Sequence, residues 1–153
     1  IMALAGLSLF AAATPSRDEV TITGRLHADT SDLEAAILVV ELEQELCLRS
    51  VLLRNGRFEF KVPVGAHARL VFLKPGYLTK EVLVDTKNAL VSAQANKINK
   101  TVKFDVVLES TEERKHQAYL GPVGYIHFVN GTGLMRVRHD ERMVAVAQEV
   151  KDE

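Results

Sequence analysis

Apolar and polar residues alternate with a period of two over long stretches of this chain, and no other feature limits its fold as strongly. In the first such stretch Val20, Ile22 and Leu26 share one face, while polar side chains occupy the other. Successive side chains of a β-strand point to opposite faces, so a strand with one buried face shows this period. The sequence therefore predicts an all-β fold. Seven strands are expected, over residues 19–27, 35–42, 46–54, 57–62, 66–73, 78–84 and 101–108.

Glycine and proline mark the turns between these strands. Asn55-Gly56 is the strongest short signal for a hairpin, because both turn positions favour a positive φ. In Lys74-Pro75-Gly76-Tyr77, proline presets φ and glycine supplies the positive φ of a type II turn. Residues 86–100 lack the alternation, and we expect a long connection with one or two helical turns near residues 89–95. Seven short strands separated by frequent turn signals are typical of a β-sandwich.

The C-terminal third differs from the preceding segment in its pattern of charged and apolar residues. Residues 110–117 are charged and predict a linker, and residues 125–129 and 134–137 predict a hairpin around Asn130-Gly131-Thr132-Gly133. A two-stranded hairpin is not stable alone in water, so we expect the tail over 119–153 to pack on the sandwich or on a partner. The sandwich is therefore assigned to residues 19–109, and the linker with its hairpin and tail to residues 110–153.

The first thirteen residues, Ile1 to Ala13, are apolar and carry no charge. They end in Ala11-Ala12-Ala13, which matches the small residues at the cleavage site of a secretory signal. A membrane-spanning helix needs about 20 apolar residues, so this segment is too short to cross a bilayer. We expect the remnant of a secretory leader, and a protein exported across the inner membrane to the periplasm or outer membrane. A retained apolar segment packed against the protein is the alternative.

Composition and spacing argue against several functions. The 19 basic and 20 acidic residues nearly cancel, so a basic face for nucleic acid is not expected. The single cysteine, Cys47, precludes an internal disulfide and a cysteine-based zinc cluster. No serine lies in a G-x-S-x-G elbow, and no histidine pair has the spacing of metal ligands. We therefore expect no catalytic residue, no cofactor and no metal, and a protein that is not an enzyme. The histidines are His27, His67, His116, His127 and His139.

Two charged clusters leave alternatives open. Asp29, Asp32 and Glu34 lie in one loop, and grouped carboxylates suit calcium, but their spacing lacks the regular alternation of a calcium loop. They are either an ordinary acidic turn or a calcium site. The basic segment Arg136-Val137-Arg138-His139, followed by Arg142, is either a solvated strand face or a docking surface for an acidic partner.

The segment from Asn55 to Gly65, the strand over 68–72 and the segment Pro75 to Val84 together resemble the carboxypeptidase regulatory-like family. Thr23-Gly24-Arg25 looks like the first strand of that family, and the resemblance covers roughly residues 20–109. It implies a seven-stranded transthyretin-like (prealbumin-like) or Ig-like β-sandwich, here with a C-terminal β-hairpin extension. Similar domains attach to peptidases, outer-membrane transporters and adhesins, where they act as folding or docking modules. The resemblance implies a secreted protein of a Gram-negative bacterium, notably of the Bacteroidota, in which such a domain follows a secretory signal.

From these patterns we expect a non-catalytic protein of the periplasm or cell envelope. Its expected role is to bind a protein partner or to act as a scaffolding subunit of a larger assembly. A carbohydrate- or calcium-dependent binding module is one alternative, and a small hydrolase that uses His27 or His67 is another. The sequence leaves the partner and the oligomeric state open.

Overall fold

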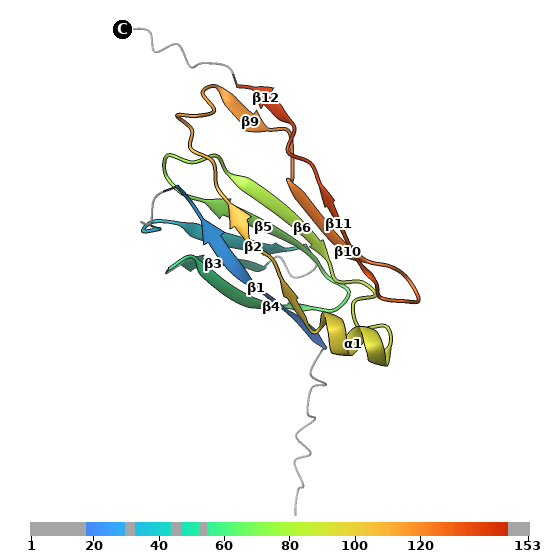
Figure 1. Ribbon diagram of the computed structural model, residues 1–153. Helices are drawn as coiled ribbons and strands as arrows, with labels where there is room; N and C mark the ends of the chain where they lie inside the picture. Colours follow the sequence, from blue (N-terminus) through green and yellow to red (C-terminus); the bar gives the residue numbers. More distant parts are fainter. Residues whose placement is uncertain (1–17, 30–32, 44–46, 53–54, 147–153) are drawn as a thin grey trace, which may run out of the picture.

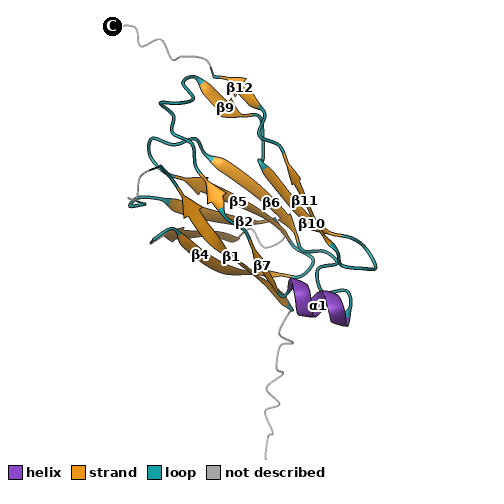
Figure 2. Cartoon of the chain, in the orientation of Figure 1, coloured by secondary structure: helices purple, strands orange, loops and turns teal. Residues whose placement is uncertain are grey.

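The computed structural model describes residues 18–29, 33–43, 47–52 and 55–146. This part of the chain is predominantly β, with twelve strands and one short helix (Figure 1, Figure 2), and the prediction of an all-β fold is confirmed. The strands are β1 (Glu19–His27), β2 (Ile37–Leu42), β3 (Cys47–Leu52), β4 (Arg57–Pro63), β5 (His67–Leu73), β6 (Lys80–Asp85), β7 (Thr101–Lys103), β8 (Val106–Val107), β9 (Gln117–Tyr119), β10 (Gly124–Phe128), β11 (Met135–His139) and β12 (Met143–Ala145), and the helix is α1 (Ala93–Asn99).

The first sheet has four strands in the order β4-β1-β7, and β8 also pairs with β1. β4 runs antiparallel to β1, with Val62 opposite Val20, whereas β7 and β8 run parallel to it. Asn55 and Gly56 both have positive φ, at 55° and 72°, so the predicted turn is present. The predicted hairpin is wrong, because β3 and β4 on either side of this turn belong to different sheets. The turn carries the chain across to β1, where the backbone N–H of Leu26 donates to the carbonyl of Gly56.

The second sheet has six strands in the order β11-β10-β6-β5-β2-β3. Its neighbours are antiparallel except β6 and β10, which are parallel, with Val82 opposite Gly124. Gly76 adopts a φ of 83° in the turn between β5 and β6, as its sequence predicts. The predicted C-terminal hairpin is present as β10 and β11, and it extends this sheet. β9 and β12 form a separate two-stranded sheet, which Figure 1 shows beyond the end of the larger one.

The two sheets enclose one hydrophobic core. Val20, Ile22 and Leu26 of β1 are almost fully buried, so the alternation correctly identified the inward face of that strand. Aromatic rings join the sheets, since the ring centroid of Phe58 lies 5.3 Å from that of Phe72 in an edge-on arrangement. Buried residues of the larger sheet complete the core, including Leu38, Val40, Leu70, Val84, Ile126 and Phe128.

The seventh expected strand, residues 101–108, is interrupted. It divides into β7 and β8, and the register against β1 is the same on both sides of the break. At the break the backbone N–H of Arg25 donates to a carboxylate oxygen of Asp105 over 3.0 Å, where a parallel ladder would use a backbone carbonyl. The carbonyl of Phe104 instead points at Gly24, whose missing side chain leaves room for it. The count of seven strands is therefore not confirmed.

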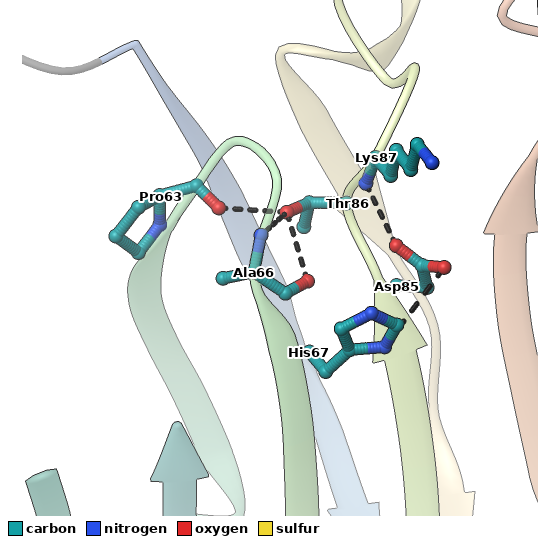
Figure 3. A network of polar contacts seen from close by, with 6 residues as sticks. All are labelled: Pro63, Ala66, His67, Asp85, Thr86 and Lys87. Atoms are coloured by element: carbon teal, nitrogen blue, oxygen red, sulfur yellow. Dashed lines mark hydrogen bonds and ion pairs between the residues drawn. The ribbon is translucent and has the colours of Figure 1, made fainter. Parts of the chain in front are cut away.

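Buried polar side chains tie the connections to the sheets. Thr86 is fully buried, and its hydroxyl donates to the carbonyl of Pro63 over 2.6 Å and accepts from the N–H of Ala66 over 3.0 Å (Figure 3). The end of β6 is thereby fixed to the turn between β4 and β5. The helix begins after Ser92, whose hydroxyl accepts the Ala95 N–H, so it lies a few residues later than predicted.

Candidate functional site

A cleft opens where the two sheets end at different positions. The larger sheet continues past β6 with β10 and β11, whereas the smaller sheet ends at β7 and β8 (Figure 1). The cleft between these ends has a volume of about 260 Å³. Its walls are mainly apolar, and they include Val82, Phe104, Val106, Ile126, Met135 and Val137. An apolar cleft with a few polar groups at its rim is the usual form of a binding site.

Lys80 is the buried charged residue of this cleft, whose lining also includes the exposed residues Lys103, Asp105, His139 and Glu141. It lies on β6, its side chain is only 7% exposed, and its Nζ is 3.5 Å from Oε1 of Glu141. The same Nζ lies 5.2 Å from the centroid of the Tyr119 ring, which is a cation–π distance. Glu141 is 61% exposed, so this carboxylate remains largely in water while the ammonium does not. A buried ammonium with one long ionic contact is costly, because burial separates its charge from water.

Tyr119 lies behind the ammonium, on β9. Its hydroxyl oxygen is buried and has no partner of good hydrogen-bond geometry among the described residues, although the nearby carboxylate of Glu109 contributes to its raised pKa. Burial raises the pKa of the Tyr119 hydroxyl to about 12, because the phenolate would be poorly solvated there. The hydroxyl therefore stays protonated at neutral pH, and its ring presents an electron-rich face to Lys80.

β11 forms the open edge of the larger sheet, and all five of its residues are exposed. Met135 and Val137 line the cleft, with exposed fractions of 40% and 46%. Arg136 and Arg138 alternate with them, and the guanidinium of Arg138 lies 5.5 Å from the ring of Tyr125. Within the described residues no carboxylate forms an ion pair with Arg136 or Arg138. The basic cluster predicted from the sequence is thus an exposed strand that is apolar on one face and cationic on the other.

Arg142, the last member of that basic cluster, is already paired. Its guanidinium donates to both carboxylate oxygens of Asp140, over 2.9 and 2.8 Å. The Arg142 side chain holds the pKa of Asp140 well below its usual range, at about 2. Arg142 is therefore not available to a partner in the way that Arg136 and Arg138 are.

The histidines named in the sequence do not come together as a catalytic or metal-binding group. Nε2 of His27 lies 3.1 Å from Oδ2 of Asp105, and this hydrogen bond holds the pKa of Asp105 below its usual value. Nδ1 of His67 lies 3.9 Å from Oδ2 of Asp85, at the far end of the network in Figure 3. His127 stacks on Tyr125 with ring centroids 5.3 Å apart. No group of three His, Cys, Asp or Glu side chains in the described ranges could hold a metal ion.

Several sequence predictions fall on residues outside the described part. In the acidic loop Asp29 accepts a hydrogen bond from the Tyr77 hydroxyl, but Asp32 lies outside the described residues, so the calcium site stays a prediction. The leader over residues 1–13 and the side chain of Cys47 also lie outside them. Across the described residues no helix is long and apolar enough to span a bilayer.

Sequence reasoning missed Lys80 as a functional residue. The signal was nevertheless present, because Lys80, Val82 and Val84 share one face of a period-two strand, and that face is buried. A lysine on the apolar face of an expected strand is unusual, since lysine is almost never fully buried without a partner. A charged residue at a position of the buried strand face was therefore enough to identify Lys80 from the sequence.

No family model and no curated protein sequence matches this chain. One solved structure that it resembles is the catechol 1,2-dioxygenase from Acinetobacter sp. ADP1 inhibited by bound mercury, at 14% identity and a TM-score of 0.43. The similarity covers 65% of this chain and 55% of the dioxygenase, little more than half of that protein's length. The dioxygenase is an enzyme, and the prediction that this chain is not an enzyme is withdrawn. No reaction, substrate or residue is carried over at this level of similarity.

Proposed function

We propose that this chain is a protein-binding subunit of an assembly in the cell envelope, and that its partner adds a strand beside β11. One observation carries the proposal. β11 is an exposed edge strand in which Met135 and Val137 alternate with Arg136 and Arg138. Natural proteins usually protect such an edge, so an open one with an apolar face suits strand addition.

The pattern of β11 defines the chemistry of the partner. An added strand forms hydrogen bonds with the free backbone groups of β11, and its side chains alternate between the two faces. On the cleft side, apolar residues of the partner would cover Met135 and Val137. On the other side, acidic residues would lie opposite Arg136 and Arg138, because opposite charges on neighbouring strands are favourable. The partner segment is therefore short, extended, and alternately apolar and acidic.

The resemblance to the carboxypeptidase regulatory-like family supports the same role. We assign the chain a transthyretin-like β-sandwich of that type, with β10 and β11 as its extension. Two sheets around one core and the tight turns at Gly56 and Gly76 fit this assignment. The apolar leader over residues 1–13 supports export to the envelope.

Photo-crosslinking in the cells that make this protein tests the proposal. A photoreactive residue is placed at Val137, and in a second strain at Val91, a valine with a similar exposed fraction near α1 (46% in both). We expect one protein linked in high yield from position 137 and not from position 91. Mass spectrometry of the linked peptide should place the contact in a segment of alternating apolar and acidic residues. Equal yields from the two positions, or a linked segment rich in basic residues, would contradict the proposal.

A further inference from the structure

We infer that the cleft between the sheets binds a small apolar carboxylate whose carboxylate group is held by Lys80. This site goes beyond the proposed function, because the ligand lies inside the cleft and the partner strand lies beside β11. The one-sided burial of the Lys80–Glu141 pair is the observation that leads to it. The Lys80 side chain is 7% exposed, whereas its ionic partner is 61% exposed.

The ammonium of Lys80 has donors to spare. It carries three N–H groups. Among the described residues its ionic contact is with Glu141, at a long 3.5 Å, and its other polar contact is with the ring of Tyr119, which accepts no conventional hydrogen bond. An ammonium in this position gains more from a close carboxylate than from either neighbour, since charge-assisted hydrogen bonds are strongest at shorter distances. The chemistry of the cleft therefore calls for an anion at this end.

The rest of the cleft calls for an apolar group. Val82, Val106, Ile126 and Val137 form its apolar wall, and none of these side chains offers a hydrogen bond. The other charged lining residues, Lys103, Asp105, His139 and Glu141, are exposed. Its volume of about 260 Å³ is below the range of about 300–1,000 Å³ that is typical of sites for drug-sized molecules. A small amphiphile with one carboxylate, such as a medium-chain fatty acid, matches both the size and the polarity.

Glu141 then acts as a competitor for the ligand. When no ligand is bound, the Glu141 carboxylate pairs with the Lys80 ammonium. Because the Glu141 side chain is exposed, it can turn into water when a ligand carboxylate binds. Replacing this carboxylate with a neutral amide should therefore strengthen ligand binding. A purely structural ion pair predicts no such gain.

Calorimetric titration of the full chain with sodium octanoate tests the inference. We expect one saturable site. The Lys80→Met variant, which keeps the apolar stem and removes the charge, should bind octanoate about tenfold more weakly or worse, because it removes the charged donors that hold the carboxylate. The matched Lys97→Met variant removes an exposed lysine of α1 that does not line the cleft, and it should change affinity less than about twofold. Glu141→Gln should bind several-fold more tightly than the unmodified chain.

Octanol, which has the same chain length and no charge, provides the ligand control. Octanol should bind the unmodified chain more weakly than octanoate does. Its affinity should be the same for the unmodified chain and for Lys80→Met. Absence of saturable octanoate binding would overturn the inference. Equal affinity for octanoate and octanol, a loss in Lys97→Met as large as that in Lys80→Met, or weaker binding in Glu141→Gln would overturn it as well. Because cross-linking at Val137 does not involve octanoate, either proposal can fail while the other holds.

Discussion

The carbonyl oxygen of Phe104 occupies the position where a side chain on Gly24 would begin. These two residues face each other at the break between β7 and β8, where the parallel ladder with β1 uses the carboxylate of Asp105 in place of a backbone carbonyl. The ring of Phe58 also approaches Gly24, with Cζ 2.6 Å from the position of a Cβ. Glycine is therefore required at this point by backbone contact, although its φ is ordinary.

Gly24→Ala should be among the most destabilising single substitutions in the chain. The added methyl group meets backbone on one side and a core ring on the other, so β1 and β7 must separate. We expect a loss of about 3 kcal/mol or more in the free energy of unfolding, measured in urea. Gly121→Ala is the matched control, because nothing lies within 4 Å of its added Cβ. Its cost should stay within about 0.5 kcal/mol, and similar losses for the two variants would contradict the contact described above.

Thr86→Val should remove the buried hydroxyl shown in Figure 3 while keeping the shape of the side chain. The N–H of Ala66 and the carbonyl of Pro63 then lose a partner away from water, and each such loss is unfavourable. We expect about 2 kcal/mol of destabilisation in a urea titration. The same substitution at the exposed Thr101 of β7 should have almost no effect. A small loss at position 86 would mean that the turn between β4 and β5 does not depend on this hydroxyl.

Phe58→Ala should cost about 3–5 kcal/mol, the usual range for a buried phenylalanine. Its ring is 3% exposed and contacts both Phe72 and Phe104. Phe104→Ala should cost less, because this ring lies partly exposed at the wall of the cleft. Thermal unfolding followed by circular dichroism gives the order of the two effects, and the reverse order would contradict the placement of the rings.

The carboxyl group of Asp140 should titrate with a pKa of about 2, below its usual 3.8, because Arg142 donates two hydrogen bonds to it. A pKa that is lower in the folded protein stabilises the folded state above the unfolded pKa. This stabilisation is lost as the pH falls from about 4 to about 2. In Arg142→Gln the pKa of Asp140 should rise toward 3.8. It should not reach 3.8, because the backbone N–H of residue 142 still donates to the Asp140 carboxylate. Carbon-detected NMR of the carboxyl group measures both values, and an unchanged pKa in the variant would exclude the ion pair as the cause.

The local pattern of the sequence predicted the strands well, because alternation depends only on which face of each strand is buried. The residues on the predicted inward faces of β1 and β4 lie in the core, as the alternation requires, among them Val20, Ile22, Phe58 and Val62. Which strands pair with each other could not be predicted from the local sequence. Asn55-Gly56 is a tight turn in sequence and in structure, yet a turn does not determine which strand the chain joins next. That choice depends on burial against β1, which lies about thirty residues earlier, and no local signal encodes it.

The candidate site was predicted only in part, for the same reason. The basic segment that includes Arg136 and Arg138 was identified from the sequence as a candidate docking surface, because its charges lie close together along the chain. The cleft was not found, since its walls come from four separate segments of the chain. Lys80 and Glu141 are sixty-one residues apart, and only the folded sheet brings them together.

The parallel pairing of β6 with β10 also has a consequence for the order in which the protein is made. Translation delivers the N-terminal strands first, and β6 must wait for some forty residues to emerge before β10 reaches it. Until then Val82 and Val84 belong to an uncovered sheet edge, which is the kind of surface that aggregates in incomplete chains. Contacts between distant segments also slow folding. A chain truncated before β10 would therefore lack both the strand that covers this edge of β6 and one wall of the cleft.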